Sequence, residues 1–473
     1  MAGAVGFKEA VAHQMAAYMK LEHNLDRLFA YARSWFLPFK QGRFRSLAQE
    51  GLWIVVGQAA AVAGVLVGIR VLTELLDPVA YGELALGMTA ALLINQTVFG
   101  PLGNGVARFY APAVEQDDFH GYLTVVRRLV LAAIGIIIFM ILVAVVALQI
   151  AGQSEWIAIT IAALIFAMLI GCNSILSGIQ NAARQRSIVA LHQGMDYWMR
   201  FLVATGLVLW FGATSTVVMF GYAISSILVL ISQFLFFRKI AHRYTPKVNK
   251  EKGWQAQIWA YSWPFLAWGT FSWVHQSSDR WVLERFATIQ DVGLYSVLFQ
   301  LGYYPISVAA GMATQFLAPI LYQRAGDASD SRRTAHVSHL SWYFTGLALG
   351  MTGAAFLVAL SFHRQIFQIF VGKEYAIVSY LLPWMLLASG IFVSGQSISL
   401  NLMSQMKTRI MVMAKIITAV VGVIFNVAGA YWYGIMGVVM ASVLFSVVYF
   451  LWMLVLFQGI AVNSNSSLMR PLQ

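Results

Sequence analysis

Two stretches of this chain are free of charge over distances that suit a membrane helix. Residues 129–154 and 156–183 contain no Asp, Glu, Lys or Arg. About 20 apolar residues let an α-helix cross a hydrocarbon core roughly 30 Å thick. Lipid offers no hydrogen-bond partner to backbone groups, so such runs must be helical. Since 60% of the 473 residues are hydrophobic and 11% are charged, against about 25% charged in soluble domains, we expect an all-α membrane protein.

The other apolar segments extend this pattern to about twelve transmembrane helices in two six-helix lobes. The first half contains 52–72, 82–103, 129–150, 156–178, 195–211 and 217–237, and the second contains 257–276, 293–320, 340–362, 376–397, 411–432 and 434–457. These bounds predict an N-terminal cytoplasmic or interfacial extension (1–51), an N-lobe of helices 1–6 (52–237), a basic cytoplasmic linker (238–256), a C-lobe of helices 7–12 (257–457) and a cytoplasmic tail (458–473).

Within the extension, apolar side chains recur at the spacing of one helix face. They are Phe7, Val11, Met15, Tyr18 and Met19. Because lysines lie beside this stripe, we expect a helix at the cytoplasmic membrane interface.

The distribution of Lys and Arg orients the spans, because cytoplasmic loops collect positive residues. With the N-terminus inside, the predicted cytoplasmic segments hold 26 of the 31 Lys and Arg residues. The opposite side holds Arg70, Arg280, Arg285, Arg364 and Lys373. We therefore expect both termini in the cytoplasm. The net charge of +12 then reflects topology, and no motif supports a nucleic-acid partner.

The two halves repeat each other. Arg70, near the end of the first span, recurs 210 residues later as Arg280, and each is followed by Glu at the fourth position. Gly82, which opens the second span, recurs 211 residues later as Gly293. Since six is an even number, both lobes begin on the same side of the membrane. A parallel pseudo-repeat about the membrane normal, as in many transporters, is therefore expected.

The residues that hold metals or nucleotides are sparse. The single cysteine, Cys172, lies in an apolar run, and His336 and His339 have no third ligand nearby in sequence, which makes a poor metal site. Gly372 and Lys373 lack the rest of a phosphate-binding loop. We expect no metal site and no cofactor. We expect a coupling ion, H+ or Na+, or substrate flux to supply the energy for transport.

Three stretches carry a resemblance to a known family. They are LTELLDPVAYGELAL (72–86), DRWVL (279–283) running to VGLY (292–295), and VGKEY (371–375) running to LLP (381–383). Here the sequence resembles the polysaccharide-transport flippases of the multidrug, oligosaccharidyl-lipid and polysaccharide (MOP) exporter superfamily, which move O-antigen and exopolysaccharide repeat units. The resemblance covers about residues 46–459, and the first 45 residues depart from the family pattern.

The resemblance implies two lobes facing a cavity that opens alternately to either side of the bacterial inner membrane. It implies a lipid-linked oligosaccharide, on undecaprenyl pyrophosphate, that moves to the outer leaflet for lipopolysaccharide or exopolysaccharide synthesis. Membrane lipids and polysaccharide assembly proteins are the other implied partners. The physics agrees, because sugar hydroxyls lose their hydrogen bonds to water in hydrocarbon.

Polar residues in the predicted spans or next to their ends are the candidates for substrate binding. Arg70 and Arg280 suit phosphate, since a guanidinium binds it through two donors, yet each could simply pair with the Glu four residues later. The other candidates are Asn95, Gln96, His275, Gln276, Asp196, Arg200 and Lys415. The first four suit sugar hydroxyls or bonds between helices. The last three lie near predicted helix ends, where they line the cytoplasmic mouth or extend toward the interface.

Two other functions stay open from the residues alone. A membrane-embedded polysaccharide polymerase or glycosyltransferase would act on the same lipid, but such families need a large external loop, and every predicted external loop is short. A cation-coupled multidrug exporter would keep the fold but would want acidic residues in its cavity, where the candidates are mostly Arg and Lys. We therefore expect a transporter and not an enzyme.

Overall fold

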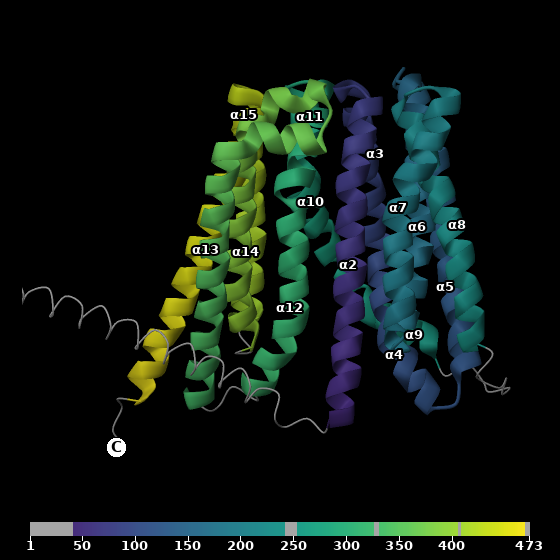
Figure 1. The fold of residues 1–473 in the computed structure, drawn as a ribbon. Coiled ribbons are helices and arrows are strands. Elements are labelled where there is room, and N and C mark those ends of the chain that lie inside the picture. Colours follow the sequence, from purple (N-terminus) through teal and green to yellow (C-terminus); the bar gives the residue numbers. More distant parts are fainter. Residues whose placement is uncertain (1–40, 242–252, 326–330, 405–407, 469–473) are drawn as a thin grey trace, which may run out of the picture. The chain divides into compact units, whose positions relative to one another are not determined.

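The computed structural model describes residues 41–241, 253–325, 331–404 and 408–468, and these are helical almost throughout (Figure 1). The chain divides into two compact units, residues 1–56 and 57–473. In the first unit the described residues, 41–56, form the beginning of α2 (Gln41–Leu75). The interfacial helix predicted around residues 7–19 lies outside the described residues.

The helices of the second unit follow the predicted order. After α2, the first half contains α3 (Pro78–Ile94), η1 (Asn95–Phe99), α4 (Gly100–Glu115), α5 (Phe119–Ile150), η2 (Ser154–Trp156), α6 (Ile157–Ala182), α7 (Arg186–Phe211) and α8 (Ser215–Ala241). The second half contains α9 (Trp254–Ser262), α10 (Pro264–Phe286), α11 (Ile289–Gly302), α12 (Tyr304–Ala325), α13 (Ser331–Phe370), η3 (Lys373–Leu381), α14 (Leu382–Ser404) and α15 (Thr408–Leu468).

Each of the twelve predicted spans falls on these helices, so the all-α membrane fold is confirmed. In the described part of the chain, nine segments are long and apolar enough to cross a membrane. The difference from twelve has two causes. α15 contains two predicted spans that meet at Gly434, where φ is 56°, and α7 and α10 carry charged residues in their interiors and are not among the nine. The count of twelve stays a prediction.

Several helices are longer than predicted. α7 begins at Arg186 and not near residue 195. α10 continues to Phe286, so most of the predicted external stretch 277–292 is helical. α15 continues to Leu468 into the predicted tail, and α9 begins at Trp254 within the predicted linker. The predicted bounds were too short because charged and polar residues lower the mean hydropathy of these segments. Such residues do not prevent helix formation when their charges are paired along the helix.

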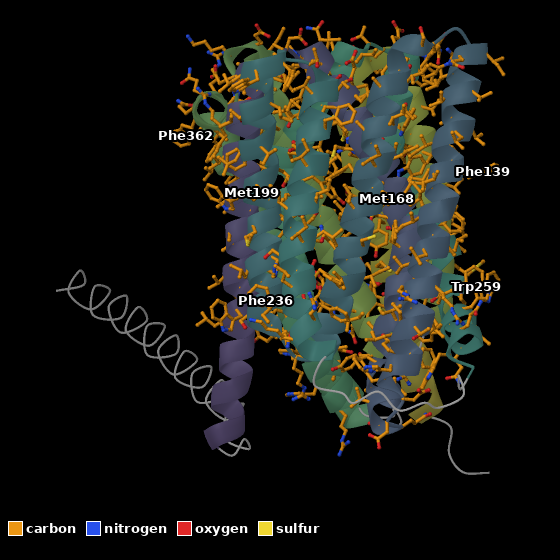
Figure 2. The ribbon with its side chains drawn as sticks, turned by 90° about the vertical axis from the view of Figure 1, so that its right-hand side faces the viewer. Phe139, Met168, Met199, Phe236, Trp259 and Phe362 are labelled. Carbon is orange, nitrogen blue, oxygen red and sulfur yellow. The ribbon has the colours of Figure 1, made fainter. Side chains whose placement is uncertain are left out.

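Much of the outer surface is apolar. Phe139 on α5, Trp259 on α9 and Phe362 on α13 are 66%, 63% and 52% exposed (Figure 2). Contiguous apolar surface on this scale is not tolerated in water, whereas a bilayer solvates it. The protein is therefore a multi-pass membrane protein.

The two halves touch where α3 and α11 begin. Gly82 of α3 and Gly293 of α11 face each other there, and a Cβ on either glycine would overlap a backbone carbonyl oxygen of the opposite helix. The hydroxyl of Tyr375 on η3 donates to the carbonyl of Leu76 at 2.9 Å beside this contact. Glycine at both positions allows a backbone approach that any side chain would prevent. The repeat in the sequence thus places its two matched glycines against each other.

The short helix α9 anchors the start of the second half to the first. Trp254 is fully buried and its indole Nε1 donates to Asp118 Oδ2 at 2.8 Å. Its ring lies edge-on to Phe109 and Tyr122, each with a centroid distance of 6.3 Å. α9 therefore packs on α4 and α5 before the chain enters α10 at Pro264.

Candidate functional site

A cavity of about 450 Å³ lies between the two halves. Helices α2, α3, α6, α7 and α8 line it from the first half, and α10, α11 and α12 line it from the second. Arg200 on α7 and Arg280 on α10 both contribute to its wall. Among the described residues that line it, none is Asp or Glu. The cavity wall therefore presents one guanidinium from each half, and the aspartates paired with them, Asp196 and Asp279, do not line it.

Contacts with neighbouring residues of α10 and α11 fix the Arg280 side chain in the cavity wall. Its Nη1 donates to the Gln276 carbonyl at 2.8 Å and lies 3.2 Å from Asp279 Oδ1. The guanidinium also lies 4.4 Å from the Phe299 ring centroid. Both hydrogen bonds that it makes to the described residues come from Nη1, and a guanidinium has five N–H donors. Donors on Nη2 and Nε are thus available to an anion in the cavity.

The carboxylate beside Arg280 is Asp279 and not the predicted Glu284. Asp279 also accepts a hydrogen bond from the Tyr295 hydroxyl at 2.6 Å and is almost fully buried. A carboxylate with two such partners fixes the position of Arg280. Sequence reasoning considered only the i,i+4 spacing and missed the adjacent residue.

Arg200 and Asp196 form an ion pair in the middle of α7, in which Arg200 Nε donates to Asp196 Oδ1 at 3.2 Å and Nη2 contacts Oδ2. The guanidinium lies 5.0 Å from the Phe166 ring centroid and 5.1 Å from that of Tyr197. Their predicted place near the start of the helix is wrong, because α7 begins ten residues before Asp196. The pair is partly buried, with side-chain exposures of 15% for Arg200 and 19% for Asp196, and Arg200 lines the cavity.

A second cavity of about 420 Å³ lies within the second half, between α10, α11, α12, α14 and α15. Lys415 on α15 lines it, donates from Nζ to Gln396 Oε1 at 3.1 Å, and lies 5.9 Å from the Trp268 ring centroid. Gln276, Phe299 and Tyr304 line both cavities. The two cavities are therefore adjacent, and their walls carry three cations.

Amide and aromatic side chains complete the first cavity. Gln276 and Gln300 line it, and Gln300 Nε2 donates to the Tyr81 hydroxyl across the two halves at 3.0 Å. Tyr197 lines it with Tyr304, whose hydroxyl donates to that of Tyr197 at 3.2 Å. Amides and ring faces of this kind suit sugar hydroxyls and sugar rings. Sequence reasoning missed the tyrosines, since aromatic residues in membrane spans resemble an interfacial belt.

Arg70 lies elsewhere. It pairs with Glu74 at 2.6 Å, as its spacing allows, and its Nη1 donates to the carbonyls of Gln368 (3.1 Å) and Val371. These carbonyls belong to the C-terminal end of α13, where a cation is favourable. Arg70 is not among the residues that line the cavity. Its geometry favours a structural role over contact with substrate.

Three of the uncharged candidates, Asn95, Gln96 and His275, do not line the first cavity. Asn95 Nδ2 donates to the carbonyls of Ala91 and, across to α6, Ala167, which is a bond between helices. Gln96 Oε1 is buried, and no described residue donates to it. His275 packs its ring on Phe392 and Phe445 and lines the second cavity.

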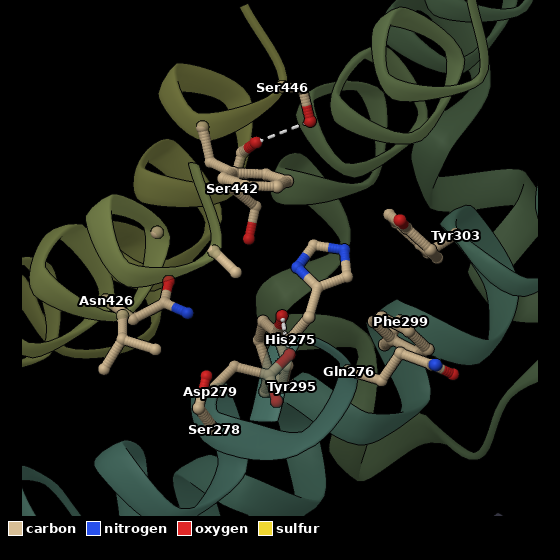
Figure 3. A pocket seen from close by; sticks show the side chains of 14 residues that line it. His275, Gln276, Ser278, Asp279, Tyr295, Phe299, Tyr303, Asn426, Ser442 and Ser446 are labelled. Carbon is tan, nitrogen blue, oxygen red and sulfur yellow. Dashed lines mark hydrogen bonds between the residues drawn. The ribbon is translucent and has the colours of Figure 1, made fainter. Parts of the chain in front are cut away.

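A small pocket of about 40 Å³ lies between α10, α11 and α15 (Figure 3). His275, Asp279 and Tyr295 line it on one side, and Asn426 and Ser442 of α15 line it on the other. It has room for about one water-sized particle. Among the described residues no group of three or more His, Cys, Asp or Glu side chains could hold a metal ion, so any cation here would rely on Asp279 and neutral oxygens.

Solved structures share this fold. An inward-facing multidrug resistance MATE family transporter of the MOP superfamily matches with a TM-score of 0.64 at 15% identity, over 88% of this chain and 96% of that one. The lipid II flippase MurJ in an inward closed conformation matches with a TM-score of 0.65 at 15% identity, over 87% and 90% of the two chains. A MOP superfamily transporter from Pyrococcus furiosus matches with a TM-score of 0.54 at 14% identity, over 88% and 96%.

Sequence comparison adds the family. No curated protein matches the chain. Residues 47–325, well over half of the sequence, match the family model described as polysaccharide biosynthesis protein. The chain therefore belongs to the polysaccharide biosynthesis protein family and has the helical fold of the MOP-superfamily transporters.

Proposed function

We propose that this protein is a flippase that moves a lipid-linked oligosaccharide from the cytoplasmic to the outer leaflet by alternating access. One observation carries the proposal: Arg200 and Arg280 come from opposite halves and line the same cavity. The partners of these arginines, Asp196 and Asp279, do not line the cavity, so the guanidinium groups that face it suit the oxygens of a phosphate or pyrophosphate. The surrounding amides and tyrosines favour sugars attached to it.

The contact between Gly82 and Gly293 supports the direction of access. We propose that it closes the cavity at the end where α3 and α11 begin, which the distribution of Lys and Arg assigns to the outside. Substrate then enters from the cytoplasm, and the contact must separate for release.

We further propose that the protein lies in the bacterial inner membrane, with twelve spans in two lobes and both termini in the cytoplasm. Its proposed partners are polysaccharide assembly proteins. A reporter fused after Gln153 should report the outside, and a cytoplasmic signal there would refute this topology.

The space between His275, Asp279 and Asn426 supports a coupling ion, H+ or Na+. Asp279 touches Arg280, so an ion bound at this carboxylate would weaken the hold on the arginine and link ion binding to the substrate cavity. Transport into proteoliposomes should then respond to an imposed H+ or Na+ gradient. A rate that neither gradient changes would leave substrate flux as the drive.

Neutralising the cavity arginines tests the substrate class. Arg280→Gln and Arg200→Gln should each reduce surface polysaccharide and accumulate the lipid-linked intermediate on the cytoplasmic leaflet. Arg285→Gln is the matched control, because Arg285 is an exposed arginine on the same helix. Protein abundance must be measured in each case.

Two outcomes would count against the proposal. Normal export by both cavity variants would remove the arginines from the substrate site. If the variants instead change resistance to cationic drugs while export stays normal, the multidrug-exporter alternative would be favoured.

A further inference from the structure

An apolar groove of about 340 Å³ runs between α12, α13 and α14, apart from the two cavities described above. Ala309 and Ala313 line it from α12, and Leu347 and Met351 line it from α13. Among the described residues of its wall, none is charged. Leu347 and Met351 are 60% and 65% exposed, so the groove is open to lipid along one side.

The groove follows α12 over several turns. Its wall on α12 extends from Ile306 to Leu321, which is about 22 Å at the helical rise of 1.5 Å per residue. One leaflet of the hydrocarbon core is about 15 Å deep, half of the roughly 30 Å total. Buried Leu321, Val337 and Leu400 pack together at one end. The groove therefore has room along its length for an extended hydrocarbon chain.

One side chain joins the groove to the charged part of the protein. Gln396 of α14 lines both the groove and the second cavity. On the cavity side its Oε1 accepts a hydrogen bond from Lys415 Nζ at 3.1 Å. An apolar channel therefore begins next to a cation, within the same half of the protein. A molecule with a long apolar tail and an anionic linkage matches this arrangement.

We propose that the groove between α12, α13 and α14 holds the polyprenyl tail of the substrate, with Lys415 beside the point where the tail leaves the groove for the cavities. This inference rests on the proposed function. Lipid is as apolar as the groove, so the groove adds little attraction and instead orients the tail. The alanines on α12 leave room for the methyl branches of a polyprenyl chain. The cation at Lys415 beside the groove favours a tail that carries an anionic linkage.

Photocrosslinking tests the occupant. The photoreactive amino acid p-benzoylphenylalanine replaces Ala313 or Met351. A matched control carries it in place of Phe139, which is 66% exposed on α5. Each protein is placed in nanodiscs of phosphatidylethanolamine and phosphatidylglycerol with undecaprenyl pyrophosphate as the probe. Intact mass spectrometry should find undecaprenyl pyrophosphate adducts at Ala313 and Met351 several-fold above the level at Phe139. Phospholipid adducts alone, or equal polyprenyl adducts at all three positions, would overturn the proposal.

Two further measurements separate this inference from the proposed function. The photoreactive residue at Tyr197, in the first cavity, reports binding of the probe headgroup. Capture there without capture at Ala313 would refute the groove and leave the flippase intact, while no capture anywhere would refute both. In cells, Ala313→Trp should fill the groove and reduce export several-fold, whereas Ala132→Trp, at an exposed position on α5, should not. Equal export by the two variants would also refute the groove.

Discussion

The contact between Gly82 and Gly293 predicts that an added methyl group opens the protein to the outside. In Gly82→Ala the new Cβ would overlap the Ile289 carbonyl oxygen and lie 3.1 Å from Gly293 N. In Gly293→Ala it would overlap the Pro78 carbonyl oxygen and lie 3.0 Å from Gly82 N. Neither obstacle is the end of a flexible side chain, so the helices must move apart.

The size of the shift toward the open form follows from the fact that the overlap exists only in the closed form. Overpacking a close contact costs about 1–3 kcal/mol, and the cost applies only while α3 and α11 touch. The equilibrium between the closed and open outer ends should therefore shift toward the open form by roughly 5- to 150-fold.

Thiol accessibility measures this shift. Cys172, the sole cysteine, is replaced by Ala, and Ser296→Cys places a thiol in the wall of the first cavity. A membrane-impermeant maleimide added from outside should label this thiol faster in the glycine variants. Gly135→Ala is the control, since a Cβ there meets nothing within 4 Å. Unchanged labelling in Gly82→Ala, or the same acceleration in Gly135→Ala, would refute the assignment of this contact as the outer gate.

Three other changes have expected outcomes. Trp254→Phe removes a buried hydrogen bond to Asp118, which is worth about 1.5–3 kcal/mol, so hydrogen exchange of α9 should rise; no such rise is expected for Trp259→Phe, where the ring is exposed. Asp279→Asn removes the counter-charge of Arg280, whose side chain is only 10% exposed. This change should cost about 3–5 kcal/mol of stability and lower the melting temperature. Adding Arg280→Gln to this variant should restore part of the lost stability. Arg70→Gln should slow export only mildly, because the side chain contacts α13 carbonyls outside the cavity; complete loss at normal abundance would contradict the structural role.

The sequence by itself determined the fold class and the order of the helices. Long uncharged runs in lipid leave helix as the only conformation, so the twelve predicted segments all fall on helices. The sequence also marked Asp196, Arg200 and Arg280 as candidates, although it placed the first two near the start of a span and Arg280 beyond the end of one. Matched glycines at an offset of 211 were visible before their contact was known.

Only the tertiary structure decided which polar residues share a site. Arg70 and Arg280 occupy matched places in the repeat, yet one caps α13 and the other faces the cavity with Arg200. Spacing along a helix reports which residues share a face, but not which neighbouring helix that face meets. The partners of Arg280, the tyrosines of the cavity wall and the groove beside Gln396 all depend on contacts between distant segments, and one sequence carries no record of those contacts.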